Sequence, residues 1–175
     1  AWAAAWSPAP PEEKRSEARI LGRLWAPDWS VSQPDVLAEA AVEGGERPAL
    51  LEQAEQFIFM EYFILKEGYM WEKILEILER KAQAGVEVRV MYDGTCAMFD
   101  LPYRYPEELK AKGMQCKMFA PIHPILSTHY NNRDHRKILV IDGKVGFTGG
   151  VNIGDEYINR VEKHGHWKDT AVVLK

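Results

Sequence analysis

The sequence predicts an α/β domain in which helices flank a mixed central β-sheet. Two observations lead to this fold class. Short apolar segments typical of strands alternate with amphipathic helical segments between residues 57 and 119, and further strand-like segments follow between residues 138 and 174. A chain that alternates in this way builds a sheet with helices on its faces. The length of 175 residues corresponds to one domain.

The clearest helix is predicted over residues 69–84. Apolar side chains recur there at the spacing of one helical face, and Gly85 supplies a C-terminal stop. Residues 86–92 then alternate apolar and polar side chains, which predicts a strand, and Asp93-Gly94 ends it. The apolar face of the helix comprises Trp71, Ile74, Leu75, Leu78 and Ala82.

The remaining elements are predicted from the same signals. Glu61 lies inside a predicted strand over residues 57–65, and a buried carboxylate needs a partner. We therefore expect Glu61 to pair with a cation near the functional site or, alternatively, to face water at the rim of the domain. Further helices are expected over residues 16–25, 48–56 and 106–112, a helical start over 153–158, and strands over 114–119, 138–141, 145–148 and 167–174.

Composition and charge narrow the function classes. The formal net charge of −4 argues against a general nucleic-acid-binding protein, which usually carries a basic excess. Cys96 and Cys116 form neither a disulfide framework nor a Cys-x-x-Cys pair, so a reducing environment is expected. Apolar runs stay short of the ~20 residues that a membrane-spanning helix needs.

His135 and Lys137 are the strongest candidates for chemistry. They precede a short apolar segment that predicts a buried strand, and residues two apart on a strand point to the same face. A neutral imidazole can attack an electrophile and hold it covalently, and a neighbouring ammonium can neutralise the oxyanion charge that develops there. A phosphodiester fits this pair. The alternative is that both are surface residues at the end of a strand.

The residues that follow extend this pattern into a family motif. His135-x-Lys137-x4-Asp142, followed by Gly149-Gly150-x-Asn152, resembles the HKD motif of the phospholipase D superfamily. The longer run over residues 132–157 is similar to bacterial cardiolipin synthases, as is Glu61-Tyr62-Phe63-Ile64. The resemblance covers about residues 47–175. It implies a phospholipase D-like half-domain, truncated at its C-terminal end, preceded by an arm over residues 1–46.

The resemblance implies catalytic roles for four residues. His135 would be the nucleophile or the general acid, and Lys137 would stabilise the phosphoryl oxygens. Asp169, in Trp167-x-Asp169, would accept a hydrogen bond from the imidazole and orient it. Asp142 belongs to the family pattern and is a catalytic candidate for that reason. Its spacing places it on the other face of the strand, however, and Asp142-Gly143 also predicts a hairpin turn.

Three further residues are expected to bind the substrate. Gly149 and Gly150 allow backbone amides to approach a ligand oxygen, and Asn152 offers an amide donor. We expect no cofactor and no metal, because Lys137 and backbone dipoles supply the countercharge. His164-Gly165-His166 provides two ligands, which do not make a metal site, and His123 and His129 are expected to be loop histidines without a catalytic task.

The implied function is transfer of a phosphatidyl group between two phosphatidylglycerol molecules through a phosphohistidine, which gives cardiolipin. The expected partners are a phospholipid substrate, a membrane surface, and a second HKD half in the same full-length chain or in a homodimer. No nucleic acid is expected as a partner. Without the second half, which supplies the leaving group's proton, the 175-residue chain should be inactive. The full-length protein would lie at a bacterial cell membrane with its catalytic part facing the cytoplasm, whereas this chain would itself be soluble.

Alternatives remain open at this point. The first is a homodimeric phosphodiesterase or nuclease of the same superfamily with one motif per chain, and related possibilities are another phosphatidyltransferase or a phospholipase D. A non-enzymatic membrane-docking or phosphate-binding module is the second. The arm over residues 1–46 is interpreted as packed on the domain or partly disordered, as an interfacial segment, or as an artificial lead sequence.

Overall fold

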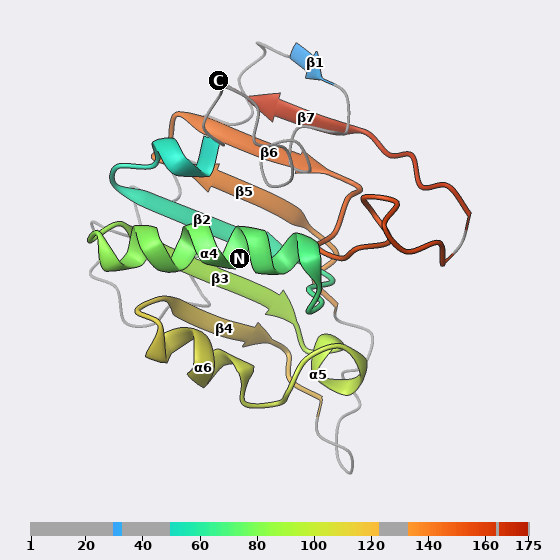
Figure 1. The fold of residues 1–175 in the computed structure, drawn as a ribbon, viewed down its shortest axis with the longest axis horizontal. Helices are drawn as coiled ribbons and strands as arrows, with labels where there is room; N and C mark the ends of the chain where they lie inside the picture. Colours follow the sequence, from blue (N-terminus) through green and yellow to red (C-terminus); the bar gives the residue numbers. More distant parts are fainter. Residues whose placement is uncertain (1–29, 33–49, 123–132, 164, 175) are drawn as a thin grey trace.

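A mixed β-sheet forms the centre of the computed structural model (Figure 1). Within the residues that the structure describes, 30–32, 50–122, 133–163 and 165–174, the sheet has seven strands in the order β1-β7-β6-β5-β2-β3-β4. β2 is parallel to β3 and β3 to β4, whereas the other neighbours are antiparallel, as the predicted fold class requires. The strands are β1 (Ser30–Ser32), β2 (Phe57–Tyr62), β3 (Glu87–Asp93), β4 (Gln115–Phe119), β5 (Lys137–Ile141), β6 (Val145–Gly149) and β7 (Ala171–Leu174).

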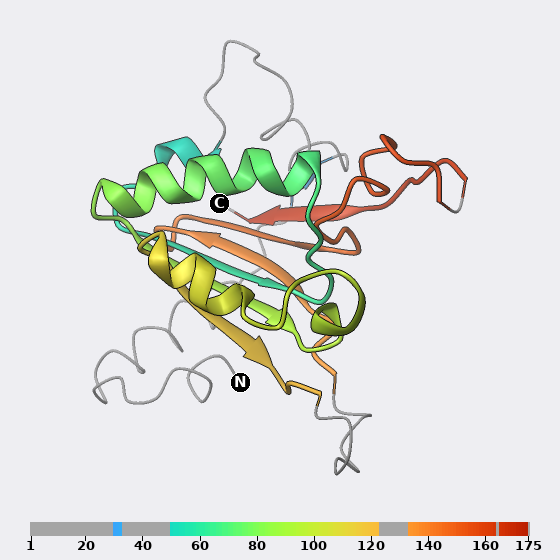
Figure 2. The same ribbon diagram turned by 60° about the horizontal axis from the view of Figure 1, so that its bottom comes forward.

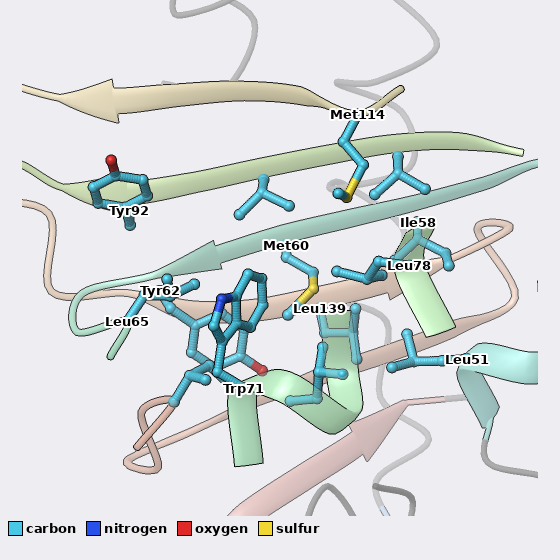
Figure 3. Packing of buried hydrophobic residues seen from close by; sticks show 14 of the residues in the cluster. Leu51, Ile58, Met60, Tyr62, Leu65, Trp71, Leu78, Tyr92, Met114 and Leu139 are labelled. Atoms are coloured by element: carbon cyan, nitrogen blue, oxygen red, sulfur yellow. The ribbon is translucent and has the colours of Figure 1, made fainter. Parts of the chain in front are cut away.

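Helices α4 and α6 cover one face of this sheet (Figure 2). The indole Nε1 of Trp71 donates a hydrogen bond of 2.5 Å to the Tyr105 hydroxyl and joins the two helices. Below them, Met60 of β2 and Leu139 of β5 are fully buried in the main core (Figure 3). Full burial of one such side chain contributes roughly 1.5–3 kcal/mol. The helical elements are η1, a 3₁₀-helix (Leu50–Gln53), α4 (Tyr69–Gln83), α5 (Cys96–Phe99) and α6 (Tyr105–Ala111).

The opposite face of the sheet carries a smaller buried cluster. Phe59, Met91 and Val140 form it, one from each of β2, β3 and β5. Their neighbours on the main-core face, such as Met60, point the other way because successive side chains on a strand alternate. The central strands are therefore buried on both faces, and the buried polar side chains of Glu61, Asp93 and Lys137 lie at or next to strand ends.

The chain segments that carry the motif lie together at one end of the strands. Tyr62 at the end of β2 pairs with Lys137 at the start of β5, and Gly149 at the end of β6 pairs with Ala171 at the start of β7. The carboxyl ends of β2 and β3 therefore lie beside the start of β5, at the end of the sheet that is on the right of Figure 1. Ligand sites in open α/β sheets commonly form at the carboxyl ends of strands.

Several predicted boundaries are wrong. The strand over 57–65 ends at Tyr62, and the strand over 167–174 begins at Ala171. The helical start over 153–158 is a series of turns, because Ile153 bonds across the chain to residues 64 and 66 instead of starting a helix. The predicted helix over 48–56 is a short 3₁₀-helix in its described part. The strand β1 and the helix α5 were not predicted.

Some predictions concern residues outside the described part of the chain. These are the helix over 16–25, the histidines His123, His129 and His164, and nearly all of the arm over 1–46. Within that arm, Ser30–Ser32 forms β1 and extends the sheet by pairing with β7.

Candidate active site

His135 and Lys137 converge at the start of β5. The Lys137 side chain is buried, and its Nζ lies 2.9 Å from Nδ1 and 3.4 Å from Nε2 of the His135 ring. Nζ also donates a hydrogen bond of 2.7 Å to the His135 carbonyl oxygen, which holds the ammonium in place. His135 itself is exposed. The pair therefore presents an accessible imidazole against a fixed cation, as the strand spacing predicts.

The surroundings of Lys137 lower its pKa, so the ammonium loses its proton more readily than a lysine in water. Burial lowers the pKa of Lys137, and the negative charges of Asp169 and Asp134 offset part of that effect. The Phe63 ring contacts both residues, with its centroid 5.2 Å from Nζ and 4.5 Å from the imidazole centroid. A cation over an aromatic face is attracted by its quadrupole, so Phe63 helps to keep both groups at one position.

Glu61 pairs with a cation beside the motif, as expected. Its Oε1 lies 2.7 Å from Nη2 of Arg136, the residue between His135 and Lys137. Burial, together with a hydrogen bond to Asp134 and its charge, raises the pKa of Glu61 to about 9, against the opposing charge of Arg136. Burial by itself would raise the pKa of Asp134 as well, but hydrogen bonds from Arg136 and Glu61 outweigh burial and lower it. Of the two carboxyl groups, Glu61 therefore keeps the proton.

Asp142 lies at the other end of β5 from His135 and Lys137. Its carboxylate accepts hydrogen bonds of 2.8 Å from the backbone N–H groups of Glu55, Gln56 and Phe57. These bonds outweigh burial and lower the pKa of Asp142. The structure thus separates Asp142 from the other catalytic candidates, and its contacts favour the structural interpretation.

Gly149 and Gly150 lie at the exposed end of β6, and each leaves room for a neighbouring part of the chain. A Cβ on Gly149 would lie 2.6 Å from the Thr170 carbonyl oxygen, and a Cβ on Gly150 would lie 2.3 Å from Oδ1 of Asp169. The absence of side chains therefore lets the Asp169 carboxylate sit against the β6 end, where its charge acts on Lys137. Among the described residues, Asp169 makes no hydrogen bond to His135, so the expected orienting contact is not formed here.

Asn152 and the residues after it fasten the segment between β2 and α4. The Asn152 Oδ1 accepts the Ile64 N–H at 3.0 Å, and its Nδ2 donates to the Tyr157 hydroxyl at 3.1 Å. Asp155 accepts the first two backbone N–H groups of α4, at 3.0 and 2.8 Å, and Glu156 pairs with Lys66 at 2.5 Å. The predicted substrate ligand Asn152 is thus buried and bonded within the chain, and one of its two amide N–H groups has no partner among the described residues.

Comparison with known proteins agrees with this geometry. A sequence profile described as "Cardiolipin synthase, PLD-like domain" matches residues 49–166. The chain belongs to this family of phospholipase D-like domains.

Individual relatives support the family assignment. The chain is 59% identical over 123 residues to an uncharacterized protein of Streptococcus mutans and 44% identical over 126 residues to a cardiolipin synthase of Geobacillus thermodenitrificans. These matches cover 70% and 71% of this chain but 27% and 25% of the relatives, so the chain spans about a quarter of their length. Nuc from Salmonella typhimurium, a phospholipase D family member, shares the fold with a TM-score of 0.52 at 15% identity, over 83% of this chain and 82% of Nuc.

Two features are not found in the described part of this phospholipase D-like domain. No group of three or more potential metal ligands and no helix long and apolar enough to cross a membrane occurs in it. Cys96 and Cys116 are buried free thiols, and burial raises the pKa of each. The recess bordered by Lys137, Tyr62 and Gly149 has a volume of about 10 Å³, close to the room that one water molecule needs.

Sequence reasoning missed two carboxylates that shape this phospholipase D-like site. Asp93 ends β3 and accepts a hydrogen bond from the backbone N–H just before His135. Asp155 caps α4, although it lies 86 residues after the start of that helix in the sequence. A signal existed for Asp93, because carboxylates at the carboxyl end of a predicted parallel strand gather at the functional edge of a sheet. The long-range cap by Asp155 had no local signal.

Proposed function

We propose that this chain is one catalytic half of a phosphatidyltransferase that makes cardiolipin from two phosphatidylglycerol molecules. The observation that carries the proposal is the buried Lys137 ammonium, 2.9 Å from the ring of an exposed imidazole. An exposed nucleophile beside a partly desolvated cation suits attack on a phosphodiester. Family membership supports the substrate class, because relatives carry the name cardiolipin synthase.

The first step forms a phosphohistidine. Without substrate, Nζ of Lys137 contacts the ring nitrogens of His135. A phosphodiester oxygen carries negative charge and is a stronger acceptor than an imidazole nitrogen. We therefore expect the Lys137 ammonium to bond to that oxygen, which leaves the lone pair of one ring nitrogen of His135 free. That nitrogen attacks phosphorus, the P–N bond forms, and the P–O bond to glycerol breaks. The glycerol alkoxide takes its proton from an acid in the second HKD half.

The second step transfers the phosphatidyl group. The free hydroxyl of a second phosphatidylglycerol attacks phosphorus, gives its proton to the same group of the second half, and breaks the P–N bond. Lys137, the free amide N–H of Asn152 and the backbone at Gly149 and Gly150 would hold the phosphoryl oxygens. Asp169, whose charge already acts on Lys137, would orient the imidazole in the complete site.

A second half and a membrane surface complete the proposal. The leaving alkoxide needs a proton that His135 cannot supply while it acts as the nucleophile, so a second HKD half, from the same full-length protein or from a homodimer partner, would supply the acid and complete the pocket. We place the full-length protein at the bacterial membrane, with this half facing the cytoplasm. A monomer of the 175-residue chain should turn over no lipid.

A trapping experiment tests the proposal. The protein with its second half is incubated with phosphatidylglycerol vesicles, quenched in alkali, and examined by mass spectrometry for a phosphatidyl group on histidine. We expect an adduct that disappears in His135→Ala if His135 is the nucleophile, together with released glycerol and cardiolipin. Double-stranded and single-stranded DNA are assayed in parallel. Cleavage of DNA without lipid transfer would support a nuclease, and lipid binding without an adduct in either half would support a non-enzymatic module.

A further inference from the structure

Three buried carboxyl groups lie behind His135 and take no part in the proposed reaction. Glu61 is the last residue but one of β2, Asp93 ends β3, and Asp134 precedes the histidine, with exposed fractions of 2%, 1% and 8%. Burying three acidic groups side by side is costly unless each is paired. Their partners are backbone N–H groups and arginines of the segment over residues 133–136.

Asp93 holds the chain on the N-terminal side of His135. Its Oδ2 accepts the backbone N–H of Asp134 at 3.0 Å, and its Oδ1 lies 3.1 Å from Nη1 of Arg133. The same Oδ1 accepts the N–H of Thr95 at 2.9 Å, which fixes the carboxylate itself. Hydrogen bonds to an ionised acceptor are about twice as strong as neutral ones, so the backbone just before the imidazole has a firm anchor on β3.

Glu61 holds the chain on the C-terminal side through Arg136. The guanidinium approaches Glu61 Oε1 at 2.7 Å, and its Nε donates to Asp134 Oδ1 at 2.8 Å. Neither oxygen of Glu61 accepts a well-aligned hydrogen bond from the described residues. A protonated Glu61 would instead donate to Asp134, in keeping with the raised pKa of Glu61. The anchor therefore works with Glu61 neutral, Asp134 ionised and Arg136 bridging them.

We propose that Glu61 and Asp93 are positioning residues, which clamp the two sides of His135 to the ends of β2 and β3 so that the imidazole meets Lys137. This inference rests on the proposed function for its kinetic consequence. Neither carboxyl group contacts the reacting atoms, since their partners lie on residues 133, 134 and 136. A misplacement of about 1 Å at a reacting group can lower a rate about 10²-fold.

The test uses paired variants in the protein with its second half. Glu61→Ala and Asp93→Asn remove one anchor each, whereas Glu61→Gln keeps the shape and neutrality of the protonated side chain. Ile77→Val, on the buried face of α4, is the control for loss of stability. We measure the melting temperature, kcat and KM for phosphatidyl transfer, and the rate at which diethyl pyrocarbonate modifies His135, located by mass spectrometry.

Positioning predicts a specific combination of results. Glu61→Ala and Asp93→Asn should lower kcat at least tenfold, change KM less than twofold, and speed modification of His135 at least threefold. Glu61→Gln and Ile77→Val should stay within about twofold of wild type in kcat, KM and the rate of His135 modification. If Glu61→Ala does not fold, Arg136→Gln reports on the same anchor, because its half-exposed side chain tolerates substitution more readily.

Failure of the inference and failure of the proposed function give different outcomes. Wild-type transfer with unchanged kcat and unchanged His135 modification in Glu61→Ala and Asp93→Asn would overturn the positioning role. A second outcome is possible. If the wild-type protein transfers no lipid but His135 is still modified at a different rate in these variants, the positioning role is supported and the phosphatidyltransferase is rejected.

Discussion

Replacing Asp142 by Asn separates the two interpretations of this motif residue. If its carboxylate is structural, the change should destabilise the fold; if it is catalytic, the change should abolish turnover with the fold intact. Asn suits the test because the backbone of Asp142 has φ +53°, a conformation that Asn tolerates better than Ala. Asn also keeps one carbonyl acceptor for the N–H groups of Gln56 and Phe57.

The magnitude follows from the three hydrogen bonds that Asp142 accepts. Asn loses the negative charge and turns an N–H₂ group toward the Glu55 N–H, which Oδ2 now accepts at 2.8 Å. Glu55 and Gln56 are exposed, so water replaces part of the loss. We expect about 2 kcal/mol of destabilisation, which corresponds to a fall in melting temperature of roughly 4–8 °C for a chain of this size.

The pH dependence provides a second check on Asp142. The pKa of Asp142 is lowered in the folded state, so its contribution is fully present above the unfolded value of about 4 and is lost as pH falls through the lower folded value. The gap in melting temperature between wild type and Asp142→Asn should therefore shrink as pH falls below about 4.

Calorimetry at neutral pH is the assay, and Glu76→Gln is the matched control. Glu76 pairs with Lys73 on the exposed surface of α4 at 3.0 Å, and exposed pairs contribute between 0 and about 1 kcal/mol. The reasoning fails if Asp142→Asn melts within 1 °C of wild type while lipid transfer is lost, because the carboxylate would then act in the chemistry.

Three further predictions follow from the site. Gly150→Ala would place a Cβ 2.3 Å from Oδ1 of Asp169, and overpacking of this kind costs about 1–3 kcal/mol. We expect a lower melting temperature and a displaced Asp169 in a crystal structure of the variant, and an undisturbed carboxylate would contradict this. Asp155→Ala removes the acceptor for the first two N–H groups of α4, so the free energy of unfolding in urea should fall by about 1–2 kcal/mol, whereas an unchanged midpoint would show that the cap is not needed. Burial lowers the pKa of Lys137 below its usual 10.5, so the phosphatidyl-transfer rate should fall as pH rises through that lowered value, and a rate that stays level up to pH 10.5 would argue against an essential ammonium.

The sequence predicts the elements best where the pattern is local. The helix over 69–84 has its apolar face in the core as expected, since periodicity reports which face of a helix is buried. The pairing of His135 with Lys137 follows from strand geometry alone, because residues two apart share a face. The strand over 57–65 was predicted too long because apolar residues beyond Tyr62 are buried outside the sheet, as Leu65 is.

The roles of polar motif residues depended on distant parts of the chain. Asn152 is predicted to donate its amide to substrate, and the structure adds that its oxygen accepts an N–H from a residue 88 positions earlier. Gly150 is predicted to open the backbone to a ligand, and the structure adds that it makes room for Asp169. A residue type and a spacing indicate what a side chain can do, but its actual partner depends on which segments the sheet order brings together.

The sequence by itself therefore determined the alternation of strands and helices, the shared face of the catalytic pair and the family to which they belong. Each depends on residues close together along the chain, where backbone geometry alone sets direction. Only the tertiary structure decided that Asp142 holds residues 55–57, that Glu61 meets Arg136, and that Asp93 anchors the backbone before His135. Buried polar groups must find partners, and here those partners lie on strands that become neighbours only when the sheet has formed.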